Sequence, residues 1–227
     1  MHKLTIDVWS DIACPWCWVG KRRLAAALAA FPHRDAVDVV LRSFELDPAA
    51  PRVADDTPFL DRLARKYGTS PAQAGGMIQR VVDVAAGDDL HLDFKKIRPG
   101  NTFDAHRLLH LAKDRNLQSQ LAERLFRAYL SEGQQLGEHS VLTELAASVG
   151  LDRGEVESIL ASDAYTRDVR ADEEDAHQLG IHGVPHFMFG PRHTVSGAQP
   201  TAALLDALTR AWTELSSDTM LDMPIHT

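Results

Sequence analysis

The chain has 227 residues, of which 44% are hydrophobic and 25% charged, and its formal net charge at pH 7 is −8. This composition is typical of a globular protein, and the acidic balance argues against nucleic acid as a partner, because phosphate binding needs clustered Lys and Arg. No stretch approaches the roughly 18 uninterrupted apolar residues of a membrane span, so no membrane partner is expected. Asp7 and Asp11 interrupt the apolar run near the N-terminus. No secretory signal is therefore predicted there, and we expect a cytoplasmic location.

The first elements predict a βαβ unit. Residues 4–9 alternate and are rich in β-branched and aromatic side chains, which predicts a buried strand. From Pro15 onward apolar residues recur at helical spacing, so a helix should begin at the cysteine motif and end before Pro32. A second strand is expected over 37–44, where the pattern is again apolar.

The middle of the chain is predicted to be helical. Between about 57 and 180 we find no convincing strand, only amphipathic patterns with capping residues. Examples are residues 101–113, 121–130, 140–149 and 163–179. A segment of this length without strands indicates a large helical insertion.

The last part changes character again. Residues 184–189 and 194–195, separated by turn residues, predict an antiparallel hairpin, and 201–215 predicts a closing helix. The expected domain organisation is a first α/β part, a helical domain, a second α/β part and a mobile tail. Their expected bounds are residues 1–48, 49–180, 181–215 and 216–227.

The two cysteines form a Cys14-Pro15-Trp16-Cys17 motif. Two cysteines fall at this spacing by chance in about 1% of placements, and such a pair in a reducing compartment is more typical of catalysis, redox sensing or metal binding than of a structural disulfide. At a helix start, unpaired backbone N–H groups and the helix dipole stabilise a thiolate. Pro15 suits the first helical position, because its missing N–H would have no partner there. Cys14 is therefore the predicted nucleophile, and Cys17, one turn later, the thiol that resolves a mixed disulfide.

Zinc binding and an inert buried pair are the alternatives for this motif. A zinc site needs two more ligands, and none of the 11 histidines has zinc-finger spacing relative to Cys17. His106 and His110 are four residues apart but lack the HExxH pattern. No metal is expected.

Four motifs in order resemble those of a known family. They are residues 11–21, 44–48 and 101–108, followed by Gly183-Val184-Pro185 before the late strand. Together they resemble the DsbA family of thioredoxin-like disulfide oxidoreductases, and within it the FrnE-like branch, over about residues 4–215. The resemblance implies an α/β thioredoxin fold with a large inserted all-helical domain. It also implies a redox-active centre at the cysteine pair that exchanges disulfides with protein or small-thiol substrates.

The resemblance also implies a substrate site around the late proline. The Val184–Pro185 bond would be cis and face the cysteines, and the Val184 backbone would pair with an extended substrate. His186, which follows, is predicted either to modulate the thiols or to be simply hydrogen-bonded or exposed. Trp9 and Trp18 are candidates for a substrate groove, although core packing is the alternative.

A second group of candidates precedes the helix expected at 101–113. Asn101 and Thr102 could cap this helix, with Asp104 favoured in its first turn. Similar glutathione-dependent isomerases and kappa-class transferases use this region in a small-thiol site, so these three residues are also candidates for substrate contact. No tightly bound cofactor is expected, and glutathione or another low-molecular-weight thiol is a candidate co-substrate.

Two departures from the family pattern concern the chemistry. Many thioredoxin-like enzymes carry a buried carboxylate six residues before the first cysteine, where this chain has Val8, and Asp7 belongs to the opposite strand face. The usual proton acceptor for Cys17 is thus not implied. The central Pro15-Trp16 contains no histidine whose imidazolium could stabilise a thiolate, so we expect a weaker oxidant than histidine-containing members.

Two other functions stay open from the sequence. One is a glutathione-dependent isomerase or kappa-class-like transferase acting on a small aromatic or polyketide-like substrate. Such relatives typically have serine near the Cys14 position and lack the second cysteine. The other is a non-enzymatic redox-sensing protein that binds a partner. An exposed apolar face on the inserted helices could also support a homodimer.

Overall fold

A four-stranded sheet organises the part of the chain that carries the cysteines. The structure, a computed structural model, describes residues 3–53, 55 and 57–221. The strands are β1 (Leu4–Ser10), β2 (Val37–Ser43), β3 (His186–Phe189) and β4 (His193–Ser196). Their order in the sheet is β2-β1-β3-β4; β1 pairs in parallel with β2 and antiparallel with β3, and β3 pairs antiparallel with β4. The predicted βαβ unit and late hairpin are confirmed.

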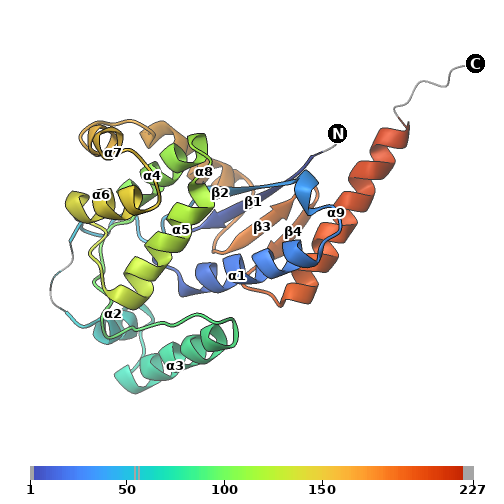
Figure 1. Cartoon of the computed structure of the whole chain (residues 1–227). Coiled ribbons are helices and arrows are strands. Elements are labelled where there is room, and N and C mark those ends of the chain that lie inside the picture. The colour runs from blue at the N-terminus through green and yellow to red at the C-terminus, as the bar shows by residue number, and fades with distance from the viewer. Residues whose placement is uncertain (1–2, 54, 56, 222–227) are drawn as a thin grey trace, which may run out of the picture.

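Helices cover both faces of this sheet (Figure 1). On one face α1 (Pro15–Ala30) and α9 (Thr201–Leu221) pack on side chains such as Ile6 and Phe187, both fully buried. On the other face, α8 (Thr166–Gln178) packs on β2 and on Trp9 of β1. The residues of β1 alternate accordingly: Leu4, Ile6 and Val8 are buried on the face covered by α1 and α9, and Trp9 is buried on the face covered by α8.

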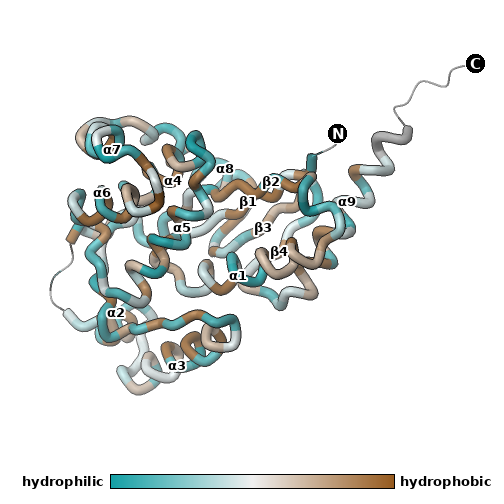
Figure 2. Tube along the Cα trace, in the orientation of Figure 1, coloured by the Kyte–Doolittle hydropathy of each residue, from teal (hydrophilic) through white to brown (hydrophobic). Residues whose placement is uncertain are grey.

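All described helices between β2 and β3 belong to the predicted insertion, and they gather at the side of the molecule where α1 begins (Figure 1). They are α2 (Phe59–Lys66), α3 (Pro71–Gly87), α4 (Phe103–Asp114), α5 (Gln118–Arg127), a π-helical turn (Ala128–Glu132), α6 (His139–Ser148), α7 (Arg153–Leu160) and α8. Figure 2 shows hydrophobic residues concentrated in the strands and along one side of many helices. The predicted α/β thioredoxin fold with a helical insertion is confirmed.

The closing helix is longer than predicted. We expected it to end at residue 215 and to be followed by a mobile tail, but α9 continues to Leu221. The Ser216 and Ser217 hydroxyls donate to the carbonyls of Trp212 and Thr213 one turn earlier, so these polar side chains are satisfied within a helix. Residues 222–227, which complete the predicted tail, lie outside the described residues.

A membrane-spanning helix would need a long apolar run. Among the residues described, no helix combines the length and the apolar character needed to cross a bilayer.

Candidate active site

The cysteine motif forms the start of α1. Cys14 is the residue before the helix, with an extended backbone (φ −94°, ψ 111°), and Pro15 occupies the first turn, as predicted. The Cys14 N–H donates to the carbonyl of Asp11, and the Cys17 N–H donates to that of Cys14, each at 3.0 Å. Both cysteines are free thiols, 5% and 2% exposed respectively. Cys14 thus lies at the end of α1 where backbone N–H groups lack partners within the helix.

The loop before β3 lies directly against Cys14. The Val184–Pro185 peptide bond is cis, as expected from the resemblance. The Cys14 thiol donates to the Val184 carbonyl oxygen, with Sγ and O 3.6 Å apart. The two segments, about 170 residues apart in the chain, therefore meet at the sulfur.

Gly20 makes this close approach between helix and loop sterically feasible. It lies in α1, one turn after Cys17, and a methyl group built on it would be 2.9 Å from Pro185 Cγ and 3.0 Å from Phe187 Cζ. Such separations are shorter than normal carbon–carbon contacts, which are about 3.5–4.0 Å. A side chain at this position would push the Pro185 loop away from the cysteines.

We expect Gly20→Ala to destabilise the protein although alanine favours helices. The overpacked contact should cost about 1–3 kcal/mol, more than the roughly 0.5–1 kcal/mol gained from helix propensity. Gly76→Ala is the matched control. Gly76 lies in α3 with open space around it, so this variant should show only the gain in stability from helix propensity. Urea denaturation measures the free energy of unfolding of both variants. A Gly20→Ala protein at least as stable as the parent would contradict the close contact.

The environment of Cys17 differs from that of Cys14. Burial raises the pKa of the Cys17 thiol well above its ordinary value, and the adjacent Cys14 raises it further. The side chain of Ser10 and the backbone of Asp11 lower this pKa, but only in part. Cys17 therefore stays protonated at neutral pH.

A buried carboxylate, Asp11, holds the loop that leads into the motif. Its Oδ1 accepts from the Ala13 N–H at 3.1 Å and its Oδ2 from the Leu46 N–H at 2.7 Å. His106 of α4 also faces it, with Nε2 3.5 Å from Oδ1. Burial alone would raise the pKa of Asp11, but His106 and the two backbone donors together lower it below its ordinary value. An ionised Asp11 thus ties the cysteine loop to the loop after β2 and to the helical insertion.

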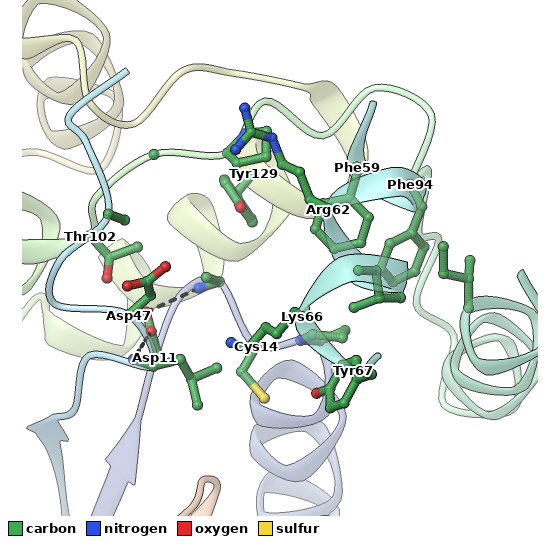
Figure 3. Close-up of a pocket in the computed structure, with 18 of the residues that line it drawn as sticks. Asp11, Cys14, Asp47, Phe59, Arg62, Lys66, Tyr67, Phe94, Thr102 and Tyr129 are labelled. Carbon is green, nitrogen blue, oxygen red and sulfur yellow. Dashed lines mark hydrogen bonds between the residues drawn. The ribbon is translucent and has the colours of Figure 1, made fainter. Parts of the chain in front are cut away.

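A cavity of about 660 Å³ opens beside Cys14 (Figure 3). Asp11, Cys14, Pro15 and Trp16 line it from the motif, and Thr102 and Tyr129 from the insertion. The helices α2 and α3 supply the opposite side, with apolar and basic side chains. Tyr129 belongs to the π-helical turn, a local geometry frequent at functional sites. A free thiol at a helix start thus faces a space large enough for a small molecule.

Comparison with known proteins assigns the family. The model of the DSBA-like thioredoxin domain matches residues 5–209, nearly the whole chain. The chain belongs to the DSBA-like thioredoxin domain family. This is a family of thiol–disulfide oxidoreductases, and the strand–motif–helix arrangement of Cys14 and Cys17 agrees with it.

Individual known proteins resemble the chain to different degrees. The Bacillus subtilis (strain 168) protein YwbO is 30% identical over 187 residues, covering 82% of this chain and 86% of YwbO. The crystal structure of the probable DsbA oxidoreductase from Streptomyces coelicolor has a TM-score of 0.88 and 44% identity, covering 99% of this chain and 93% of that one. The cytosolic disulfide reductase DsbM from Pseudomonas aeruginosa, solved with GSH, has a TM-score of 0.59 and 18% identity, covering 95% and 99%. At that identity, DsbM shows a shared fold.

The predicted groove residues Trp9 and Trp18 do not line the cavity of this DsbA-like chain. They are 2% and 3% exposed. Trp9 Nε1 donates to the Asp172 carbonyl at 2.8 Å, and Trp18 Nε1 donates to Glu123 Oε1 at 3.1 Å. Core packing, with each indole N–H satisfied internally, explains both residues, and the expectation of a substrate groove is wrong for them.

His186 points toward its own hairpin and β1. Its Nδ1 is 2.9 Å from Ser196 Oγ, and its ring meets Trp9 edge to face at 6.3 Å between centroids. Burial lowers the pKa of His186 below its ordinary value of 6.5. The ring is therefore neutral at pH 7 and supplies no positive charge to the thiols.

The three candidates before and in α4 differ in what they contact: Asn101 and Asp104 bind other residues of the chain, and Thr102 lines the cavity. Asn101 Oδ1 accepts from the Phe103 N–H at 2.8 Å, which closes a turn just before α4, whereas Thr102, the N-cap residue, makes no side-chain capping bond. Asp104 binds Arg107 at 2.8 Å. Thr102 is the member of the three that lines the cavity. Asn101 and Asp104 therefore have structural partners, and the region contributes one side chain to the space beside Cys14.

No group of three or more His, Cys, Asp or Glu side chains is placed to hold a metal ion within the described ranges. Sequence reasoning did not select Asp11, Gly20 or Tyr129 for the site. Asp11 stands inside the motif segment, three residues before Cys14, and its position at the end of a buried strand was the available signal. Gly20 and Tyr129 act through contacts distant in sequence, which no local pattern reveals.

Proposed function

We propose that this DsbA-like chain catalyses thiol:disulfide exchange through Cys14 and Cys17, as a FrnE-like member acting in the cytoplasm. The observation that carries the proposal is the position of Cys14, at the start of α1 and on the wall of a cavity, with Cys17 buried one turn behind it. The cytosolic relative DsbM supports the location. The substrates would be disulfides of proteins or of small thiols such as glutathione.

The reaction would have two steps that balance in electrons and protons. The Cys14 thiolate attacks one sulfur of a substrate disulfide, so that a Cys14–substrate disulfide forms and the first substrate thiolate leaves. Cys17, once deprotonated, attacks Cys14 Sγ, and the second substrate thiolate leaves. The substrate disulfide gains two electrons and the two protons lost by the cysteines, while the chain becomes the Cys14–Cys17 disulfide. An external thiol pair returns it to the dithiol.

The raised pKa of Cys17 supports the order of these steps. A protonated Cys17 does not compete with Cys14 for the substrate, because thiolates are the attacking species. The Ser10 and Asp11 contacts that lower its pKa are available to stabilise the Cys17 thiolate when it forms. Val8, at the position where many thioredoxin-like enzymes carry a buried carboxylate, has no such group, so Ser10 and the Asp11 backbone would perform this stabilisation instead.

Redox equilibration tests the proposal. The purified chain, incubated with glutathione and glutathione disulfide at defined ratios and then acid-quenched and alkylated, should convert reversibly between a dithiol and an internal Cys14–Cys17 disulfide, read by mass spectrometry. Cys17→Ala is the control and should stop at the mixed disulfide with glutathione. A wild-type chain that never forms the internal disulfide at any ratio would refute the proposal.

A further inference from the structure

We propose that the cavity beside Cys14 selects small disulfides that combine an apolar, ring-sized body with a carboxylate, and that Arg65 and Lys66 of α2 bind the carboxylate. This inference rests on the proposed exchange reaction and names its substrate class. It concerns residues outside the cysteine motif and the Val184–Pro185 loop. Four observations carry it: the size of the cavity, its apolar wall, the basic end of α2, and the acidic side facing that end.

The size of the cavity fits a small molecule. Its volume of about 660 Å³ lies inside the range of roughly 300–1,000 Å³ typical of small-molecule sites. The elements around it come from the first βαβ unit, from α2 and α3, and from the turn that carries Tyr129. A substrate seated there would be in contact on several sides, whereas an extended polypeptide needs an open groove or strand edge.

One wall of this cavity is apolar and partly aromatic. Phe59 of α2 and Phe94, which follows α3, bring their rings to 5.5 Å between centroids at 45°, and Met77 and Ile78 of α3 extend the same wall. Met77 is 43% exposed, so an apolar side chain faces solvent at this wall in the free protein. Covering such a surface with an apolar group is favourable, at about 25 cal/mol per Å².

Basic side chains at the end of α2 line the same cavity. They are Arg62, Arg65 and Lys66. Arg62 is engaged by the Thr57 carbonyl and by Asp55. No carboxylate in the described part of the chain forms an ion pair with Arg65 or Lys66. In a chain of net charge −8, two exposed cations that form no ion pair with any described carboxylate favour an anionic substrate at the cavity beside Cys14.

The opposite side of the cavity is acidic, and this determines which way a bound anionic disulfide would point. Figure 3 shows Asp11 and Asp47 on one side of Cys14, and Lys66 with the aromatic wall on the other. A carboxylate placed toward Asp47 would be repelled, and one placed toward α2 would be attracted. The substrate would therefore place its sulfur at Cys14, its apolar body against Phe59 and Phe94, and its carboxylate at Arg65 and Lys66.

The rates at which four disulfides oxidise the reduced 227-residue chain test this selectivity. The probes are 5,5′-dithiobis(2-nitrobenzoate), which is aromatic and anionic; 4,4′-dithiodipyridine, aromatic and neutral; glutathione disulfide, anionic and hydrophilic; and cystamine, cationic. Each second-order rate of protein oxidation is divided by the rate of the same disulfide with dithiothreitol, which removes intrinsic reactivity. The aromatic anion should have the largest ratio, and the cation the smallest.

Charge removal should affect the anionic probes alone. The Arg65→Gln/Lys66→Gln variant should lose about tenfold in the ratio for the aromatic anion, because two cations that attract its carboxylate are removed, and it should react normally with 4,4′-dithiodipyridine. The matched control is Arg80→Gln/Lys113→Gln, which removes the same charges from exposed sites outside the cavity and should change no ratio.

Three outcomes would overturn the inference. They are equal ratios for the neutral and anionic aromatic probes, no loss in the Arg65→Gln/Lys66→Gln variant, or an equal loss in the control variant. In each case oxidation still proceeds, so the exchange reaction itself survives. Failure of all probes to oxidise the cysteine pair would instead refute the proposed function.

Discussion

Replacing Cys14 with serine should abolish disulfide exchange, whereas replacing Cys17 with serine should leave a protein that captures its substrate and cannot release it. A serine hydroxyl at the start of α1 is not ionised at neutral pH and cannot form a disulfide, so the loss should be on the order of a thousandfold or more. In Cys17→Ser the first attack is intact, and the mixed disulfide at Cys14 accumulates because no thiol lies within the same turn to resolve it.

Single-turnover mixing followed by acid quench and mass spectrometry distinguishes the two variants. Cys14→Ser should show no adduct, and Cys17→Ser should show one adduct per chain. Near-UV circular dichroism verifies that both variants are folded, which we expect because both side chains are small and their replacements nearly isosteric. Exchange that persists in Cys14→Ser would remove the proposed mechanism. Turnover of a small aromatic substrate by a Cys14→Ser/Cys17→Ser protein would favour the glutathione-dependent isomerase instead.

Local sequence patterns predicted the elements that carry the cysteines. The alternation of Leu4, Ile6 and Val8 follows from a strand packed against α1 and α9, and the position of Cys14 before α1 follows from Pro15 in the first turn. These features depend on residues close in the chain. The fold could therefore be predicted largely from periodicity and from the order of its motifs.

The composition of the cavity could not be predicted in the same way. Its basic and apolar wall comes from α2, α3 and Phe94, all 45 or more residues after Cys14, and helical periodicity does not indicate what such helices face. The same limit explains the two tryptophans, whose burial depends on partners more than 100 residues away. Asn101 and Asp104 combine both kinds of contact. Each binds a group close in the chain, Phe103 N–H and Arg107 respectively, and each also binds a distant side chain, Glu45 for Asn101 and His139 for Asp104.

Asp11 is such a long-range feature, and its replacement should have the largest effect on stability. The two carboxylate oxygens of Asp11 accept from the backbone N–H groups of Ala13 and Leu46. In Asp11→Asn, one of these N–H groups would face an amide NH₂, which cannot accept a hydrogen bond. The substitution also removes the negative charge that faces His106. Leaving a buried donor unsatisfied costs about 1–3 kcal/mol, and replacing a charged acceptor with a neutral amide adds to this, because hydrogen bonds to charged groups are the stronger ones. We expect a loss of about 2–4 kcal/mol at pH 7, measured by urea denaturation.

The pH dependence of this loss identifies its cause. The folded-state pKa of Asp11 lies below the ordinary value of 3.8, so as pH falls the unfolded chain binds the proton first. The contribution of the ionised carboxylate is therefore complete above about pH 5 and is lost as pH falls through the folded-state pKa. The stability difference between the parent and Asp11→Asn should be constant from pH 7 to pH 5 and should narrow below about pH 4.

A fully exposed carboxylate provides the control. The side chain of Asp35 is 100% exposed, and Asp35→Asn should follow the parent in the denaturation series across the whole pH range. A gap between parent and Asp11→Asn that stays constant down to pH 3 would mean that the loss comes from hydrogen-bond geometry alone. In that case an ionised Asp11 would not be what fixes the loop before Cys14, and the neutral residue would serve the active site equally well.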